Sequence, residues 1–382
     1  MQLTLEQQDL TQASMIVAGL LKKSQTTLPV LSNLLIEAEG DTAYFIGTDL
    51  ESFVRVRVPV EISGGTSVRM TLPADKLSEL VSLLPAGQKV TLSDEGGQVA
   101  IKTDQAIYNL VTLPPDDYPQ WTPEEGLTTI TLAQKELRRL LDAILYALPS
   151  KDHRRILMGA LFEINDLEMS LTGTDGKKLS RIKTKLQNIE GDSITQCVVY
   201  GKLLNDMKRI LSDEGPVKLE IGTRQVAFLV DNVEYRTNVI EGKYPDVNAV
   251  IPKDFPFSVK LNRTQFLLAA RRAGVVSEDK NKSIILRFSE NNCEFTSMAA
   301  DVGRFSGNVA VKYDGNPIEI AFNYQLMIET LNSFSHPDIT LKIKSEQSPT
   351  VMNCDAELDH ICVLMPIKLA ELRAQGIVSS AD

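Results

Sequence analysis

Apolar residues in the segment 134–148 recur at intervals of three and four, which predicts a helix with one buried face. Pro149 directly after this segment ends the pattern. In residues 54–60 every second position is Val, and Arg55 and Arg57 stand between the first three, which is the period of a half-buried strand. Short apolar strands are predicted before the helix and before two similar helices, at 3–5, 130–132 and 259–261. The chain therefore mixes helices with strands in a recurring order.

A second helix and further strands follow in each third of the chain. The second helices are predicted at 74–84, 202–211 and 323–334, and closing strands at 217–221 and 339–343. Two helices with antiparallel strands, used three times, indicate an α+β fold. The irregular, Pro-containing stretches 120–126 and 248–256 are predicted linkers.

The thirds of the chain are related as an internal repeat. Gly47-Thr48-Asp49 recurs as Gly173-Thr174-Asp175, and Tyr118-Pro119 recurs as Tyr244-Pro245, in both cases 126 residues later. Two motifs with one offset are typical of a duplicated domain. A third copy is fainter and begins at Val259-Lys260-Leu261. We therefore predict three similar domains, each with two helices packed on antiparallel sheet, at 1–127, 128–253 and 254–382, the last with an extension at 370–382.

Composition narrows the class of protein. Of 382 residues, 43% are hydrophobic and 24% are charged, as in ordinary globular proteins. No apolar run reaches the ~18 residues that a membrane span needs, and the N-terminal residues lack a signal-peptide pattern. We expect a cytoplasmic protein with no membrane association and with its four cysteines reduced. The formal charge of −10 disfavours bulk attraction to nucleic acid but allows a local basic surface.

The sequence offers little for catalysis. It contains no glycine-rich phosphate loop, and its Ser and Cys residues lack a convincing His partner. Cys354, His360 and Cys362 lie close together, but their spacing matches no common zinc pattern. Asp116-Asp117 could hold Mg²⁺, yet they precede Tyr-Pro, where turn residues are expected. We expect no catalytic residue, no metal site and no cofactor.

Positive charge recurs at equivalent places in the three copies. On the predicted helix 134–148, the basic residues lie opposite the apolar stripe. For any one residue, a solvated helix face or a pair such as Arg138 with Asp142 is a sufficient explanation. Recurrence instead favours a shared electropositive surface, although the predicted helix 323–334 has no Lys or Arg. The residues of this basic set are Lys22, Lys23, Arg138, Arg139, Lys151, Arg154, Arg155, Lys202, Arg209, Arg271 and Arg272.

Several motifs together resemble a known family. They are Leu28-Pro29-Val30-Leu31-Ser32-Asn33-Leu34-Leu35, Gly47-Thr48-Asp49-Leu50, Gly173-Thr174-Asp175-Gly176, Tyr244-Pro245-Asp246 and Val363-Leu364-Met365-Pro366-Ile367-Lys368-Leu369. They resemble the bacterial DNA polymerase III beta subunit, the sliding clamp family, over residues 1–369. The resemblance implies a non-catalytic processivity factor, a head-to-tail homodimer whose six domains close a ring around duplex DNA. Helices would line the hole, where the basic set would make weak, sequence-independent phosphate contacts that permit sliding.

The resemblance also implies two further sites. Partner peptides from the polymerase III alpha subunit, the clamp loader and other clamp-motif-bearing replication and repair proteins would bind an apolar pocket. Its residues would be Leu157, Thr174, Gly176, Lys177, Leu179, Pro245, Val250, Val363, Leu364, Met365 and Pro366, although from the sequence alone they would as readily be core. The dimer interface would include Tyr108, Leu110, Val275 and Val276.

Two features depart from the family pattern. Lys368 stands where the family usually has Arg, and residues 370–382 continue past the usual end. This extension would be disordered or would lie across the pocket. Two other classes of protein remain open: a metal-dependent nuclease, which must gather carboxylates, and a repeat scaffold that does not bind nucleic acid. Retention on circular DNA with loss on linearisation would separate a topological binder from both.

Overall fold

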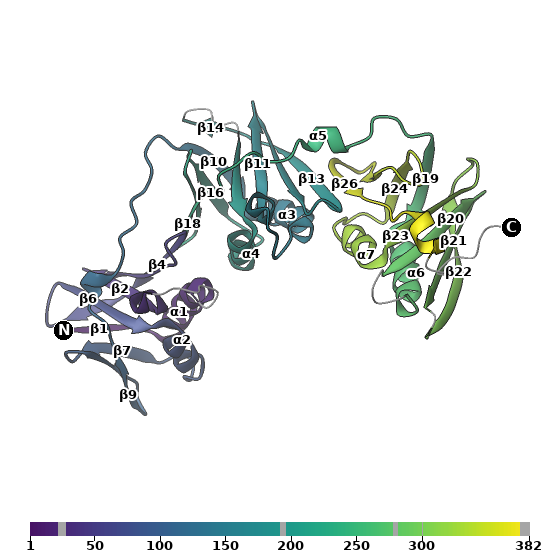
Figure 1. Ribbon diagram of the computed structural model, residues 1–382. Coiled ribbons are helices and arrows are strands. Elements are labelled where there is room, and N and C mark those ends of the chain that lie inside the picture. Colours follow the sequence, from purple (N-terminus) through teal and green to yellow (C-terminus); the bar gives the residue numbers. More distant parts are fainter. Residues whose placement is uncertain (22–27, 192–195, 278–281, 300, 375–382) are drawn as a thin grey trace. The chain divides into compact units, whose positions relative to one another are not determined.

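The computed structural model describes residues 1–21, 28–191, 196–277, 282–299 and 301–374. The chain divides into two compact units. Figure 1 labels their helices and strands. Unit 1 combines Met1–Arg138 with Leu186–Val239, and unit 2 combines Arg139–Lys185 with Ile240–Asp382. Helix α3 (Gln134–Ile144) crosses the boundary between them.

Unit 1 contains two antiparallel sheets. The smaller has the order β5-β1-β7-β8-β9, formed by Glu61–Ser63, Gln2–Glu6, Lys89–Asp94, Gln98–Lys102 and Ile107–Val111. The larger has the order β14-β10-β16-β17-β18-β4-β3-β2-β6, formed by Ile189–Glu190, Thr128–Ala133, Pro216–Ile221, Gln225–Val230, Val233–Asn238, Ser52–Pro59, Thr42–Thr48, Asn33–Glu39 and Ser67–Pro73. Its helices include α1 (Gln7–Leu21), α2 (Ala74–Ser82) and α4 (Gly201–Ile210), the last preceded by β15 (Gln196–Tyr200). Helix α1 buries Leu10 and Val17 and packs on α2, as an amphipathic helix should.

The strands of unit 2 follow one another in the order β11-β12-β13-β26-β25-β24-β19-β22-β21-β20-β23. They are formed by Gly159–Asn165, Glu168–Thr174, Lys178–Lys185, Glu357–Leu364, Thr350–Cys354, Asp338–Ile343, Phe257–Asn262, Gly303–Lys312, Asn292–Ala299, Ser283–Ser289 and Ile318–Asn323. Its helices include α5 (Val247–Val250), α6 (Arg263–Val275), α7 (Tyr324–Asn332) and α8 (Leu369–Ala374). Helices α6 and α7 pack together over a core in which the rings of Phe266 and Phe295 meet edge to face at 4.7 Å.

Strand pairing joins successive repeats in the same way twice. In unit 1, β4 pairs with β18, and Val54 lies opposite Tyr235. In unit 2, β13 pairs with β26, and Ser180 lies opposite Cys362. Because β4 and β13 are related by the 126-residue offset, each repeat offers the same strand to the last strand of the next.

The structure confirms the α+β class with three repeats and shortens some predicted elements. The helix predicted at 134–148 ends at Ile144, and a 3-10 turn (Leu145–Ala147) follows it before Pro149. The predicted linker 248–256 begins inside α5. The Asp246 carboxylate caps this short helix by accepting hydrogen bonds from the backbone N–H groups of Asn248 and Ala249. Among the described residues, no helix is long and apolar enough to span a membrane.

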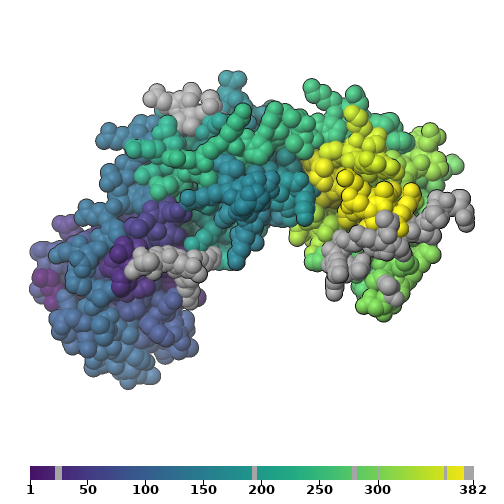
Figure 2. Space-filling model, viewed as in Figure 1, coloured from purple at the N-terminus to yellow at the C-terminus, as the bar shows by residue number. Residues whose placement is uncertain are grey.

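The described part of the extension packs on unit 2. Leu369 and Leu372 of α8 are buried against Ile285 and Ala321 on neighbouring strands β20 and β23, and Ile367 N–H donates to the Ala321 carbonyl at 2.7 Å. Figure 2 shows the C-terminal part of the described chain, in yellow, as part of the continuous surface of this unit. Neither expected alternative, disorder or a position across the pocket, therefore holds for residues 370–374. Residues 375–382 lie outside the described residues.

Helix α8 should contribute measurably to stability. We expect Leu372→Ala to lower the free energy of unfolding by about 2 kcal/mol, because a fully buried Leu side chain is removed from a small cluster. Glu371→Ala on the exposed face of α8 is the matched control and should change it by less than about 0.5 kcal/mol. Calorimetry measures both variants. Equal, negligible effects would mean that α8 is not docked in solution.

Candidate functional site

One cavity of unit 2 collects most of the residues predicted to form the pocket. Its volume is about 130 Å³. It is lined by Arg154, Leu157, Thr174, Gly176, Lys177, Lys178, Leu179, Pro245, Val247, Val250, Val363 and Met365. Nine of the eleven predicted residues are among them, and they come from four separate stretches of the chain. The fold thus brings them to one place, with mainly aliphatic walls.

A tight turn between β12 and β13 forms one wall of the cavity. Thr174 Oγ1 donates to the Lys178 carbonyl at 2.7 Å and accepts from Gly176 N–H at 3.1 Å. The Asp175 carboxylate accepts from the backbone N–H groups of Lys177 and Lys178 at 2.8 and 2.9 Å. Gly176 has φ +87°, a conformation that glycine adopts without strain. The Gly-Thr-Asp motif is therefore a turn-forming motif that shapes the wall.

The adjoining wall comes from the end of β26, and two of the residues predicted for it do not line the cavity. Val363 and Met365 line the cavity, and Met365 is 37% exposed. Leu364 lies fully buried in the core, because successive side chains of a strand point to opposite faces. Pro366 is half-buried and does not line the cavity. The prediction that Leu364 and Pro366 belong to the pocket wall is corrected accordingly. Met365 N–H donates to the Lys177 carbonyl at 2.9 Å, which ties the two walls together.

Two cations at the cavity were not predicted from the sequence as part of it. Lys178 is almost fully buried, forms an ion pair with Glu329 of α7 and lies 5.5 Å from the centre of the Tyr146 ring. Its equivalent in the first repeat is Ser52, so comparing the repeats could not predict a charged side chain at this position. Arg154 was predicted only as a member of the basic set. The Arg154 guanidinium bonds the Asp152 carboxylate at 2.9 Å and lowers the pKa of that group to about 2.

Val247, the third lining residue outside the prediction, is 4% exposed and belongs to α5. From the sequence, this position lies beside a predicted linker and has no assigned role. Val247 directly follows the motif Tyr244-Pro245-Asp246, and this position is the signal that could have identified it.

Most of the basic set is exposed, and several members are paired with carboxylates. In unit 1, Arg138 lies 2.9 Å from Asp213, Lys202 lies 3.5 Å from Asp49 and Arg209 lies 3.4 Å from Asp206. In unit 2, Arg139 lies 2.9 Å from Asp359. The pairs of Arg138 and Arg139 are exposed, and exposed pairs are worth about 0–1 kcal/mol each, so a phosphate could displace these carboxylates. Asp49 and Asp206 are only 14% and 6% exposed. The further members Lys151, Arg155, Arg271 and Arg272 are exposed. Lys22 and Lys23 lie outside the described residues.

The predicted interface residues lie on the edge strand β9 and at the C-terminal end of helix α6. Tyr108 and Leu110 belong to β9, the edge strand of its sheet, and the Tyr108 side chain is 39% exposed. Val275 ends helix α6 with 79% of its surface exposed, and Val276 follows it. An exposed apolar edge of this kind is typical of a protein–protein contact.

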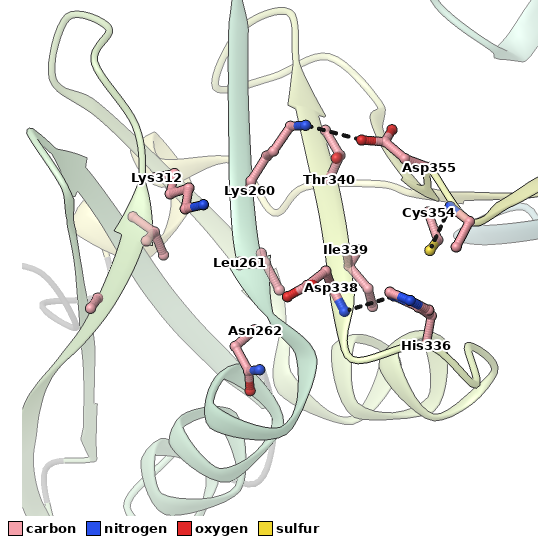
Figure 3. Close-up of a pocket in the computed structure, with 13 residues that line it drawn as sticks. Lys260, Leu261, Asn262, Lys312, His336, Asp338, Ile339, Thr340, Cys354 and Asp355 are labelled. Atoms are coloured by element: carbon pink, nitrogen blue, oxygen red, sulfur yellow. Dashed lines mark hydrogen bonds and ion pairs between the residues drawn. The ribbon is translucent and has the colours of Figure 1, made fainter.

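A larger cavity of about 510 Å³ lies over β19, β22 and β24 in unit 2 (Figure 3). Its walls mix charges: Lys260 forms an ion pair with Asp355 at 3.0 Å, and Lys312 lies on the neighbouring strand. His336 Nδ1 accepts from the backbone N–H of Asp338 at 3.2 Å. None of the predicted site residues lines this cavity. Its paired charges suit it poorly for apolar side chains, so the smaller cavity is the better candidate for a peptide.

Of the three potential metal ligands, His360 and Cys362 lie in contact, whereas Cys354 is packed in the core of unit 2. His360 Nε2 lies 3.0 Å from Ser180 Oγ and 3.3 Å from Cys362 Sγ, all buried between β13 and β26. Cys354 is buried in the core of unit 2. Within the described ranges, no group of three or more His, Cys, Asp or Glu side chains could hold a metal ion. The contact between Ser180 and His360 joins strands β13 and β26.

Comparison with known proteins gives a consistent result along the chain. Family models of the DNA polymerase III beta subunit match residues 1–122 (N-terminal domain), 131–246 (central domain) and 248–368 (C-terminal domain). Beta sliding clamps from Pseudomonas aeruginosa and Escherichia coli are 27% and 26% identical, over 97% of this chain and 100% of theirs.

Solved structures agree with these matches. The P. aeruginosa sliding clamp bound to griselimycin has a TM-score of 0.91 and 27% identity, and it covers 97% of this chain and 100% of that one. The C. crescentus clamp with bound polyethylene glycol has a TM-score of 0.90 and 28% identity at the same coverage. Because the three family models together match most of the chain, it belongs to the DNA polymerase III beta subunit family, the sliding clamps, which are non-catalytic subunits in DNA replication.

Proposed function

We propose that this protein is the processivity factor of a replicative DNA polymerase, a homodimeric ring that encircles duplex DNA in the cytoplasm and slides along it. The observation that supports the ring is the repeated strand pairing. Strand β4 pairs with β18 and β13 pairs with β26, so each repeat contacts the next by the same strands. The third repeat has the strand equivalent to β4 and β13, which is β22, and the first repeat has the strand equivalent to β18 and β26, which is β9. In a head-to-tail dimer, β22 of each chain would pair with β9 of the other.

The strand pairs of the repeats predict the register of this contact. Residues 304–308 of β22 pair with β21, and no other strand pairs with them among the described residues. Tyr235 lies opposite Val54, and the strand pairs within each repeat make Tyr108 the equivalent of Tyr235 and Phe305 the equivalent of Val54. The same register therefore places Phe305 opposite Tyr108 of the partner subunit. An antiparallel contact of this length would join the sheets of the two chains.

Helix packing supports the same contact. The C-terminal end of α1 is buried at Leu20 and Leu21, and α1 contacts α4 of the next repeat. The corresponding end of α6 exposes Val275. In the dimer it would lie against the second helix of the partner's first repeat. We propose domain boundaries at 127/128 and 253/254, one domain for each repeat.

The basic set would contact the DNA phosphates. A closed ring retains DNA by topology, so weak contacts that read no bases are sufficient and permit sliding. The cavity beside Met365 would receive short apolar peptide segments of the polymerase alpha subunit, the clamp loader and other replication and repair proteins. Its aliphatic walls and the adaptable Met side chain suit Leu or Phe anchors.

A retention experiment tests the proposed function. Clamp loaded on nicked circular plasmid should stay bound during gel filtration in high salt, and it should be lost once the plasmid is linearised. Equal loss from both forms would exclude a topological ring. Divalent-metal-dependent cleavage of the plasmid would instead favour the nuclease, and binding to neither form would favour the scaffold.

Salt dependence tests the basic set. Replacing Arg271 and Arg272 together by Glu should reduce the slope of log K against log[salt] by about 1–2, since each phosphate contact contributes roughly 0.9. Lys218→Glu, on a strand outside the basic set, is the matched control and should leave the slope unchanged. Fluorescence anisotropy with a duplex of random sequence measures both. An unchanged slope for the double variant would remove these two residues from the DNA contact.

A further inference from the structure

The first and second repeats build the same turn with the same bonds. Thr48 Oγ1 donates to the Ser52 carbonyl at 2.8 Å, as Thr174 Oγ1 does to the Lys178 carbonyl at 2.7 Å. The Asp49 carboxylate accepts from Ser52 N–H at 2.7 Å, matching the bond from Asp175 to Lys178. The wall of the cavity in unit 2 thus has a close counterpart in unit 1.

The tyrosine beside each turn, Tyr118 or Tyr244, makes similar hydrogen bonds in the two repeats. The Tyr118 hydroxyl accepts from Thr48 N–H at 3.2 Å and lies 3.4 Å from the Ile46 carbonyl. The Tyr244 hydroxyl donates to the equivalent carbonyl, that of Thr172, at 3.4 Å. Burial raises the pKa of both phenols, so both remain neutral donors. A proline follows each tyrosine and starts the segment that passes over the turn.

The two repeats differ in what fills the space beside this turn. In unit 2, Leu179 and Val247 line the open cavity. Their equivalents in unit 1 are Phe53 and Trp121, whose ring centroids lie 5.8 Å apart. Trp121 packs on a buried apolar cluster that includes Leu31, the counterpart of Leu157 in the cavity.

Apolar contact holds the indole in this place. Trp121 Nε1 is buried, and within the described part of the chain no acceptor lies within hydrogen-bond distance. On the adjoining strand β18, Arg236 is 9% exposed and stands at the position that Val363 takes in the cavity of unit 2. A large flat side chain seated on Phe and Leu residues is what an apolar pocket receives from a bound peptide.

We propose that the Trp121 indole is a built-in occupant of a second, repeat-equivalent pocket in unit 1, and that it limits each chain to one open pocket. This inference rests on the proposed function, because it takes the cavity of unit 2 as a receptor for apolar side chains. Removing the indole would open a site that accepts flat apolar molecules.

Replacing Trp121 by Val, the residue that the second repeat has at Val247, tests the proposal with indole as the probe. Equilibrium dialysis of labelled indole should find one more bound molecule per chain in Trp121→Val than in the parent. Trp121→Phe keeps a ring in place and is the matched control, which should bind the same number as the parent. Circular dichroism checks that each variant is folded.

An equal number of bound indole molecules in Trp121→Val and Trp121→Phe would overturn the proposal. A second small variant, Trp121→Leu, serves if the first does not fold, and unfolding of both would show that Trp121 is core rather than an occupant. The retention experiment on circular DNA does not depend on Trp121. Failure of the ring and failure of the built-in occupant are therefore separate results.

Discussion

Replacing Val275 and Val276 together by Asp should convert the dimer into monomers. Both side chains stand at the open end of α6, and Val275 is 79% exposed in the single chain. In the proposed ring they would be buried, so the substitution would place unpaired carboxylates in an apolar contact at a cost of several kcal/mol. The contact occurs twice in each ring. We expect the dimer dissociation constant to rise at least about a thousandfold, which is roughly 4 kcal/mol.

Sedimentation velocity at micromolar concentration measures this change, and the variant should also fail to stay on circular DNA. Leu167→Asp is the matched control, because Leu167 is 54% exposed at the turn between β11 and β12 and has no place in the proposed contact. It should sediment as the parent does. A double variant that remained dimeric would place the interface elsewhere and would also undermine the register proposed for β22.

Local periodicity and the internal repeat were sufficient to predict the fold. The alternation in 54–60 and the apolar spacing in 134–148 are local signals, and the structure has a strand and a helix there. The repeat offset then related distant segments without any knowledge of their contacts. What this reasoning could not provide is the pairing of β13 with β26, because the partners are about 180 residues apart and neither sequence specifies the other.

The candidate site shows the same division between local and long-range information. Nine pocket residues came from motifs, but Leu364 was misplaced because a motif names neighbours without separating the two faces of a strand. Lys178 was missed because its burial depends on Glu329, which lies on a helix of another repeat. Helix α8 was missed because it lies beyond the repeat and packs on a patch of β20 and β23 that its own sequence does not specify.

Met365, directly after β26, and Met352 on the neighbouring strand β25 should give opposite results when they are shortened. Met365 lines the cavity and is 37% exposed, whereas Met352 on β25 is 1% exposed and belongs to the core. Met365→Ala should weaken binding of a polymerase-derived peptide by about 1–2 kcal/mol, a five- to thirtyfold rise in Kd, because the side chain that is shortened would pack on the bound peptide. Its free energy of unfolding should change little, since solvent already reaches the side chain.

Met352→Ala is the matched control and should lose about 2–5 kcal/mol of stability, because it leaves a void in a close-packed core. At a temperature where it stays folded, it should bind the peptide as the parent does. Titration of a fluorescein-labelled peptide and thermal unfolding, measured on the same samples, distinguish the two effects. If Met365→Ala lowered Tm as much as Met352→Ala did, or bound the peptide unchanged, Met365 would be a core residue and the cavity beside it would not be the receptor. Met352 and Met365 belong to paired, neighbouring segments of one sheet, so the two substitutions differ mainly in whether the side chain faces the core or the cavity. Opposite outcomes would therefore assign peptide binding to the cavity side, where Val363 and Met365 lie.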